Sequence, residues 1–486
     1  MSTSTAAQVR SQLSHPIIDA DGHFVEIGAL LDEEIITYIE EEAGAEVRER
    51  YLAGSAAPID TVTNLHDRGD ERIRREWRAM PSWWGWQAEN TYDRATMHLP
   101  PLLYDRLDEF ALDYALIYPS MSLSFLDLLD GELAAVLCRA VNRMHARTFE
   151  PYGDRMTVGA LIPMSTPETA IAELEYAVGE LGFKTAVIAG SARRPIAAVH
   201  DADPRLDDIA YRLDTFGLDS EYDYDPFWAA CLQRGISPVT HSSLQAHRIT
   251  RSVSNYVYNH VGGLAAMHES LCKSLFLGGV THRFPDLRVG FLEGGVGWAC
   301  SLYADLVGHW EKRNAAEIGQ LDPSVLDVEA FMQYVQKHGS DAMTSRLDAI
   351  RQYFERPAAR PAVLDEFSAV GIEQATDLRD KFAPRFFFGC EADDPLVAWA
   401  FRDDVNPMGA IMQPLFGSDI SHWDVPDMTE PVPEAYELVE HGLLTDDQFR
   451  QFVFENAVKL HARNNPSFFR GTAVEAAADE VLSSTG

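Results

Sequence analysis

Eight short apolar segments recur along the chain, most of them separated by segments with helical periodicity. The apolar segments span residues 17–21, 113–119, 156–162, 183–189, 236–240, 287–292, 386–390 and 414–418. Near-continuous apolar strands that alternate with helices are typical of a parallel sheet covered by helices. Eight such units predict an α/β fold, a closed (β/α)8 TIM barrel. A doubly wound open sheet is the alternative, but no G-x-G-x-x-G motif follows the first strand.

The length of 486 residues exceeds the roughly 250 residues of a plain barrel. We expect the excess in helical insertions after strand one (residues 28–112) and strand six (residues 318–383), and in a C-terminal helical extension. The barrel is expected to form one domain over residues 16–465, between a flexible tail at 1–15 and a second tail at 466–486.

Composition limits the kinds of partner and the cellular compartment that we expect for this protein. The net charge of −35 makes nucleic acid an unsuitable partner, because phosphate binding needs a basic surface. There is no apolar run of about 18 residues, so no membrane span is expected. The polar start of the chain has no signal-like apolar region, and the five cysteines form no CxxC pair. These features predict a cytoplasmic protein without a disulfide framework.

Metal-binding side chains stand at the ends of four predicted strands. Asp21 and His23 are two residues apart at the end of the first strand, so their side chains point the same way. His241, Glu293 and Asp419 end the fifth, sixth and eighth strands. In a barrel these strand ends meet on one face, where converging carboxylates would repel each other without a cation. The sequence therefore predicts a metal site there.

The chemical types of the candidate ligands limit which metal ion can bind but do not identify it. Imidazole and carboxylate without thiolate suit Fe, Mn or Zn, and three carboxylates carry enough charge for two divalent ions. His260 is predicted equally well as a further ligand or as a residue that orients one. For His422 we favour a role in orientation or proton transfer. Asp19 shares the parity of Asp21 but should lie deeper in the barrel, and Glu26 is a further candidate donor.

The order of these motifs resembles a known family. The motifs are Ile18-Asp-Ala-Asp-Gly-His, Pro238-Val-Thr-His, Phe284-Pro-Asp-Leu-Arg-Val, Leu292-Glu-Gly-Gly-Val-Gly-Trp and Phe416-Gly-Ser-Asp. They resemble the amidohydrolase-related TIM barrels, which include metal-dependent decarboxylases of aminocarboxymuconate semialdehyde and of hydroxybenzoates. The resemblance runs from about Pro16 to Ala462. It implies that Asp21, His23, His241 and Asp419 are metal ligands.

One position departs from those decarboxylases, which have a catalytic His where this chain has Glu293. The long insertions and the run Cys272–Thr281 are more similar to a longer subgroup, which includes the non-haem diiron monooxygenase of platensimycin and platencin biosynthesis. That resemblance implies two Fe ions on Asp21, His23, His241, Glu293 and Asp419, with His260 as a further ligand. It also implies O2, an external electron donor, and hydroxylation of an unactivated C–H bond in a bulky hydrophobic, diterpenoid-like substrate. Relatives in the subgroup act on CoA-linked substrates.

Two other hypotheses stay open. One is a decarboxylase or hydrolase with a single Zn or Mn ion, in which Asp419 or His422 acts as the base. The other is a binding barrel without turnover, which the intact ligand set disfavours. Under the monooxygenase hypothesis Glu293, Asp419 and His422 are the catalytic residues.

The first insertion holds the aromatic residues Trp83, Trp84 and Trp86. Beside the barrel mouth they would form an apolar wall for a hydrophobic substrate, although a packed insertion core explains them equally well. The large insertions are also compatible with a homodimer.

Overall fold

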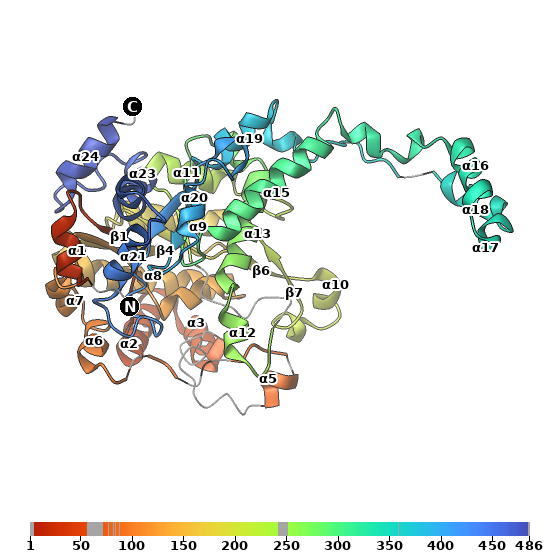
Figure 1. The fold of residues 1–486 in the computed structure, drawn as a ribbon. Coiled ribbons are helices and arrows are strands. Elements are labelled where there is room, and N and C mark those ends of the chain that lie inside the picture. The colour runs from red at the N-terminus through yellow and green to blue at the C-terminus, as the bar shows by residue number, and fades with distance from the viewer. Residues whose placement is uncertain are drawn as a thin grey trace.

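Eight parallel strand positions form the centre of the molecule (Figure 1). The computed structural model describes residues 4–55, 71–241 and 251–484, except Glu76, Pro81, Trp83, Gln87 and Ala358. The strands are β1 (Ile18–Phe24), β2 (Tyr114–Pro119), β3 (Met156–Val158) with β4 (Ala160–Leu161), β5 (Ala186–Ile188), β8 (Val239–Thr240), β9 (Val289–Phe291), β10 (Phe386–Cys390) and β11 (Gln413–Phe416). Each strand falls on one of the eight predicted apolar segments.

Hydrogen bonds join two runs of parallel strands into a closed barrel. One run is β1-β2-β3 and the other is β11-β10-β9-β8-β5-β4. Gly159 links β3 to β4, and its N–H donates to the Ile117 carbonyl of β2 (2.9 Å). On the other side, the Asp419 N–H donates to the Asp21 carbonyl (3.0 Å) and the His23 N–H to the Ile420 carbonyl (3.1 Å). The predicted (β/α)8 barrel is therefore confirmed.

Burial on both faces explains why these strands are apolar. Every residue of β1, β2, β9 and β10 is buried. Helices between the strands cover the outer face, as expected for a parallel barrel. They include α8 (Gly131–Phe149), α9 (Pro167–Gly179), α11 (Asp225–Arg234), α13 (Gly263–Leu277), α15 (Gly297–Arg313) and α20 (Val397–Ala400). After β11 follow α21 (Pro431–Glu440), α22 (Asp446–Arg450) and α23 (Asn456–Ala462).

An antiparallel hairpin between β5 and β8 was not predicted from the sequence. It consists of β6 (Ala192–Pro195) and β7 (Tyr211–Asp214). The buried Arg194 stabilises it by donating to the Asp214 carboxylate (3.1 Å) and to the Tyr224 hydroxyl (2.8 Å). A buried arginine at the centre of a short polar strand gives no alternation of apolar residues, so the pattern misses it.

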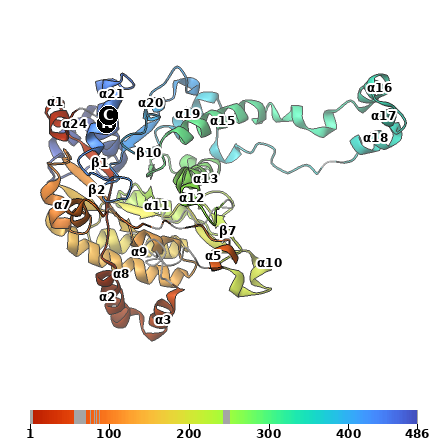
Figure 2. The same cartoon turned by 60° about the horizontal axis from the view of Figure 1, so that its bottom comes forward.

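Helices occur in the described parts of both predicted insertions. Between β1 and β2 lie α2 (Gly28–Tyr38), α3 (Ala45–Arg50), α5 (Glu71–Arg75), α6 (Thr91–Thr96) and α7 (Pro100–Arg106). Between β9 and β10, α15 leads into residues 318–363, which we call the arm. The arm carries α16 (Val328–His338), α17 (Asp341–Thr344) and α18 (Leu347–Phe354), and it projects away from the barrel in both views (Figures 1 and 2). The chain then returns to the body through α19 (Ala375–Phe382).

The two ends of the chain differ from the expected tails. Residues Ala6–Gln12 form α1, which is capped by Thr5 and buries Val9. Near the other end, α24 (Glu475–Ser484) buries Ala478 and Val481. Each helix has only two buried positions, which is too short a pattern to recognise in sequence. None of the described helices has the length and apolarity needed to cross a membrane.

Candidate metal centre

Five residues predicted at strand ends lie together at the C-terminal mouth of the barrel. Two overlapping groups have ligand atoms within 4.8 Å of one another. The first is Asp21, His23 and His241, and the second is His23, Glu293, Asp419 and His422. His23 belongs to both groups. Because β1, β8, β9 and β11 end on the same face, residues far apart in sequence can meet there.

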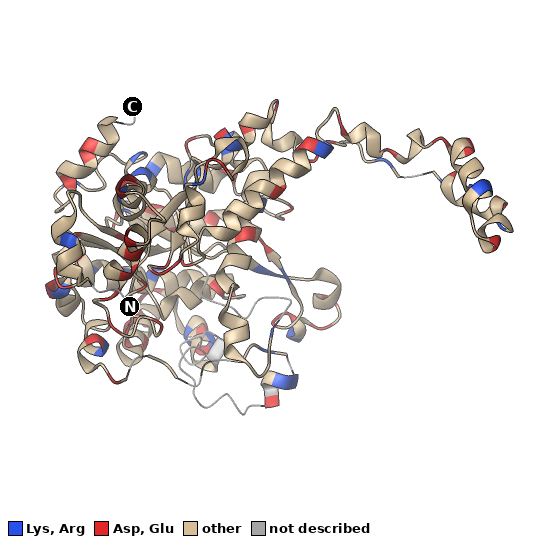
Figure 3. Ribbon diagram, viewed as in Figure 1, with Lys and Arg blue, Asp and Glu red and all other residues tan. Residues whose placement is uncertain are grey.

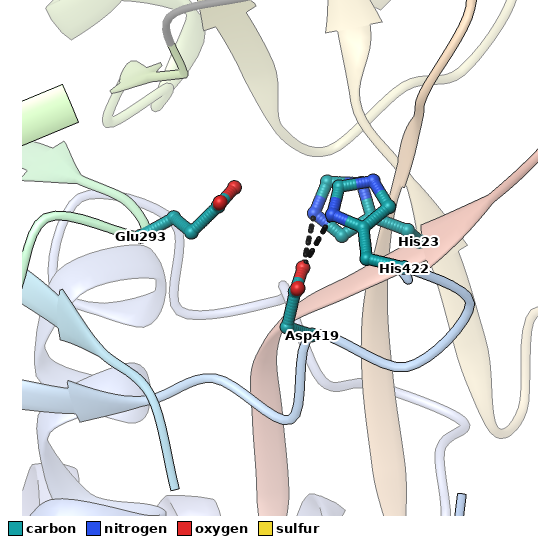
Figure 4. A group of neighbouring side chains, drawn as sticks. All are labelled: His23, Glu293, Asp419 and His422. Carbon is teal, nitrogen blue, oxygen red and sulfur yellow. Dashed lines mark ion pairs between the residues drawn. The ribbon is translucent and has the colours of Figure 1, made fainter. Parts of the chain in front are cut away.

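Asp419 joins two imidazoles. Its Oδ1 lies 2.7 Å from His422 Nδ1 and 3.3 Å from His23 Nε2 (Figure 4). Glu293 approaches from the opposite side of the site (Figure 4). Its Oε2 lies 3.0 Å from His241 Nε2. His23 Nε2 is also 3.5 Å from Asp21 Oδ1. Carboxylates and imidazoles thus alternate in two neighbouring series, one formed by Asp21, His23, Asp419 and His422 and the other by His241 and Glu293.

Several of these atoms are buried without a hydrogen bond to the rest of the described protein. They are Asp21 Oδ1, His23 Nε2, His241 Nδ1 and Asp419 Oδ2. Buried polar atoms without partners are costly unless water or an ion satisfies them. The donor set of imidazoles and carboxylates fits Zn, Mn or Fe. The residues present therefore fit a divalent cation.

The electrostatics also favour a cation. Burial raises the pKa of Asp21 well above its usual range, and the neighbouring Glu293 raises it further. Burial and the Glu293 charge act in the same way on the pKa of Asp419. Burial alone would raise the pKa of Glu293, but the hydrogen bond and charge of His241, together with the charges of His422 and His260, outweigh this and lower the pKa to about 2. The same carboxylate raises the pKa of His241 against the effect of burial. A bound cation would relieve the repulsion among the carboxylates.

The backbone is strained where two of the carboxylates leave their strands. Glu293 has φ of 54° and Asp419 has φ of 49°, in the left-handed region that non-glycine residues seldom adopt. Such a conformation costs about 1–3 kcal/mol and persists where the surroundings enforce it. The chain also approaches closely at Gly417, where a Cβ atom would lie 2.9 Å from Asp21 Cβ. Gly417 thus leaves room for the Asp21 side chain.

Asp19 lies outside both ligand groups and binds the backbone next to two of the ligands. Its Oδ1 accepts hydrogen bonds from the backbone N–H groups of Ser418 (2.9 Å) and Asp21 (3.1 Å). Its Oδ2 accepts one from the Ser418 hydroxyl (2.6 Å). Burial raises the pKa of Asp19 to about 6 despite these bonds. Asp19 therefore ties the end of β11 to β1.

Glu26 lies away from the ligand groups. Its carboxylate accepts from the Met121 N–H (3.0 Å) and the Ser122 N–H (3.3 Å), and it lies 3.5 Å from His145 Nε2. Burial alone would raise the pKa of Glu26, but the His145 ring outweighs it and lowers the pKa. Glu26 therefore holds the turn that follows β2.

Ser120 is a site residue that the sequence analysis missed. Its Oγ lies 3.0 Å from His422 Nε2 and 3.5 Å from His23 Nδ1. It directly follows Pro119, the last residue of β2, and that position at a strand end was the available signal. On each of these two imidazoles, Ser120 thus contacts the ring nitrogen that does not face Asp419.

A pocket opens beside the centre. Its volume is about 340 Å³, and its wall includes Glu293, Glu391, Asp394, Asp424, His260 and Trp423. His260 was predicted equally well as a ligand or an orienting residue. The structure places it in this wall, 5.4 Å from the Trp423 ring, and outside the two ligand groups found among the described residues.

Two of the three predicted tryptophans lie near the pocket. The Trp84 ring is 5.6 Å from Trp423, and the Trp86 ring is 5.8 Å from His422. Trp83 lies outside the described residues. The first insertion thus brings aromatic side chains to the barrel mouth.

Three solved structures are among those similar to this chain. An amidohydrolase from Mycobacterium avium subsp. paratuberculosis K-10 is 14% identical with a TM-score of 0.49, covering 92% of this chain and 99% of that one. A 2,6-dihydroxybenzoate decarboxylase from Rhizobium is 12% identical with a TM-score of 0.43 (93% and 100% covered). A 4-oxalomesaconate hydratase from Rhodopseudomonas palustris is 14% identical with a TM-score of 0.44 (96% and 99% covered). No curated protein sequence matches the chain.

A family model described as amidohydrolase matches residues 18–374, well over half of the chain. The match begins at β1 and includes Asp21, His23, His241 and Glu293, while Asp419 and His422 lie beyond it. It confirms the predicted resemblance at the level of the superfamily, but it does not support the finer assignment to the diiron monooxygenase subgroup. The chain belongs to the amidohydrolase family.

Proposed function

We propose that the protein is a hydrolase or decarboxylase that depends on one divalent ion, Zn or Mn. The observation that carries this proposal is the convergence of Asp21, His23 and His241, with unpartnered buried ligand atoms, at the mouth of an amidohydrolase-family barrel. Asp419 completes the set. When bound, the ion would supply Lewis-acid polarisation of a substrate oxygen or activation of water.

The pair Asp419 and His422 is suited to proton transfer. His422 Nδ1 faces the Asp419 carboxylate (2.7 Å), and its Nε2 faces the Ser120 hydroxyl (3.0 Å). Partners on both ring nitrogens fix the orientation of the imidazole. His422 is therefore held ready to take or give a proton at the barrel mouth.

The charge of the pocket bears on the substrate. Glu293, Glu391, Asp394 and Asp424 line a pocket of only about 340 Å³. Burial raises the pKa of Glu391 to about 8, so at neutral pH the repulsion of an anionic group comes from the other carboxylates. The volume suits a small molecule better than a bulky diterpenoid. The charge favours a neutral or cationic group at this wall, and the volume favours a small substrate.

A non-haem diiron monooxygenase is the second candidate. One observation favours it: the two ligand groups overlap at His23, and Glu293 stands near His241 with a carboxylate that two ions could share. Its substrate would then be the bulky hydrophobic one that the resemblance implies, with O2 and an external electron donor. The family match does not extend to this activity.

The test measures substrate conversion under nitrogen, in the absence of O2. Protein stripped of metal and reloaded with Zn or Mn should convert at least one member of a panel of small amides, lactones and aromatic carboxylic acids. Conversion should need no O2 and no reductant, and the Asp21→Asn variant serves as the inactive control. Conversion that appears only with iron, O2 and a reductant would instead establish the second candidate.

A further inference from the structure

Four carboxylates line the pocket beside the metal centre. They belong to Glu293, Glu391, Asp394 and Asp424. Glu293 pairs with His241 at 3.0 Å, but within the described part of the chain none of the four forms an ion pair with a Lys or Arg. The chain has 75 acidic and 40 basic residues, and acidic residues are spread over the ribbon (Figure 3). Acidic surface is therefore ordinary in this protein, so a ligand site needs further evidence at this pocket.

One of these carboxylates has a buried oxygen without a partner. Asp424 Oδ1 is buried and accepts no hydrogen bond from the described residues. A buried carboxylate oxygen in this state is costly unless a ligand, an ion or water satisfies it. The carboxylates also act on one another, since burial and the charges of Glu293 and Asp424 raise the pKa of Glu391 to about 8. A positively charged ligand would relieve both the unpartnered oxygen and the mutual repulsion.

The ion proposed at the metal centre does not balance these charges. A single divalent ion carries two positive charges, which match the two carboxylates among its proposed ligands, Asp21 and Asp419. Glu293, Asp394 and Asp424 lie outside that set and line the pocket. The pocket therefore stays acidic once the ion is bound, and its walls screen the charge less than bulk water does.

Aromatic rings form another part of the same wall. Trp423 and His260 line the pocket, with ring centroids 5.4 Å apart. Two further rings pack against Trp423 from outside the wall: Tyr256 on α12 (Tyr256–His260) at 6.1 Å and Trp84 of the first insertion at 5.6 Å. Trp binds a cation through its ring face more strongly than the other aromatic residues do. Carboxylates and a tryptophan ring in one pocket are the chemistry that recognises an organic ammonium group.

We propose that the pocket binds the ammonium group of a small organic cation, held by the Asp424 and Glu293 carboxylates and the Trp423 ring. The class follows from the charge, the ring and the volume of about 340 Å³, which admits a small molecule. As a statement about the substrate it rests on the proposed function, because it assumes that the molecule bound here reacts at the metal centre. Binding of the cation itself is independent of turnover and of the type of reaction.

The test is calorimetric titration of the full chain, loaded with Zn, with pairs of cationic and neutral probes of similar shape. Choline is compared with 3,3-dimethylbutan-1-ol, and butylammonium with butan-1-ol. The cation should bind roughly ten times more tightly than its neutral counterpart, because only the cation interacts with the carboxylates and the ring face through its charge. Choline cannot coordinate Zn through its nitrogen, so its binding reports on the pocket. No preference for the cation in either pair would overturn the proposal.

Variants distinguish this pocket from the general attraction of an acidic protein for cations. Asp424→Asn and Trp423→Leu should each weaken choline binding roughly fivefold, while the Zn content stays at the wild-type value. Asp393→Asn and Trp399→Leu are the matched controls, since Asp393 is exposed and does not line the pocket, and Trp399 is 41% exposed on α20. Because Asp424→Asn keeps the side-chain shape, it decides the question even if Trp423→Leu fails to fold. Equal losses in variants and controls would overturn the proposal.

Metal analysis of the same samples separates the ways in which the proposals can fail. If the pocket carboxylates bind a second divalent ion, the wild type will hold two Zn ions per chain and show no preference for choline, which overturns the inference. Choline binding without conversion of any substrate in the panel would contradict the proposed function and leave the ammonium site standing. Conversion of neutral substrates without a preference for choline would overturn the ammonium site alone.

Discussion

Asp419 Oδ1 lies 2.7 Å from His422 Nδ1, so a strand-end carboxylate orients an imidazole three residues further along the chain. The turn that permits this has positive φ at both Asp419 and Ser421. On the account proposed above, Asp419 binds the ion and His422 transfers the proton. This division of roles can be tested residue by residue.

Replacing His422 should separate proton transfer from metal binding. His422→Ala should lower kcat by about 10²–10⁴-fold, the usual contribution of a general acid or base, while the metal content per chain stays unchanged. Ser120→Ala, which removes only the hydroxyl on Nε2, should have a smaller effect. Loss of the metal from His422→Ala would make this residue a ligand and contradict the assignment.

Glu293→Gln distinguishes the two candidate functions. The substitution removes a negative charge 3.0 Å from His241 Nε2 while keeping the side-chain shape. If one ion is held by Asp21, His23, His241 and Asp419, the variant should keep that ion, because Glu293 is then outside the ligand set. Glu391→Gln is the control, since it removes another carboxylate from the same pocket without touching a ligand group. A fall from two ions per chain to one would identify Glu293 as a ligand of a second metal.

Asp19 should matter for stability more than for chemistry. Asp19→Ala leaves the buried Ser418 N–H, Ser418 hydroxyl and Asp21 N–H without their acceptor. Each buried unsatisfied group costs about 1–3 kcal/mol, so the free energy of unfolding in urea should fall by at least that amount. Asp19→Asn keeps one acceptor oxygen, so the free energy of unfolding of this variant should fall less. The comparison uses metal-free protein, and equal stability of Asp19→Ala and wild type would refute the structural role.

His461 predicts how stability depends on pH. It is buried on α23 against the Phe468 ring, and burial lowers its pKa from 6.5 to about 3. Below pH 6.5 the unfolded chain binds a proton at this position that the folded protein excludes, so stability falls as pH drops from 6.5 toward 3. The contribution is about 1.4 kcal/mol per pH unit.

The measurement compares unfolding in urea at pH 7.0 and pH 5.5 for wild type and His461→Leu. The variant should lose less stability than the wild type on acidification, while His441→Leu, at an exposed position, should behave like the wild type. If wild type and His461→Leu lose the same free energy of unfolding between pH 7.0 and pH 5.5, the buried histidine does not determine how stability depends on pH in this range.

Strand positions and strand-end ligands could be predicted because both depend on local signals. Buried parallel strands must be largely apolar, and Asp21 ends such a predicted segment while His241, Glu293 and Asp419 each follow one directly. Barrel topology then brings them together without further information.

The remaining features depend on tertiary contacts that leave little trace in the sequence. The β6–β7 hairpin is held by the buried Arg194, and the position of His260 is set by packing against Trp423. Ser120 acquires its role only because β2 lies next to β1. The arm was visible as an insertion, but its projection away from the barrel was not predictable from helical periodicity.

Metal stoichiometry tests the central claim most directly. Protein purified without oxygen or added metal should be analysed by plasma mass spectrometry together with its His241→Ala variant. The account predicts about one Zn or Mn ion per wild-type chain and loss of that ion from the variant. Two iron ions per chain, with the spectroscopic signature of a coupled iron pair, would contradict it.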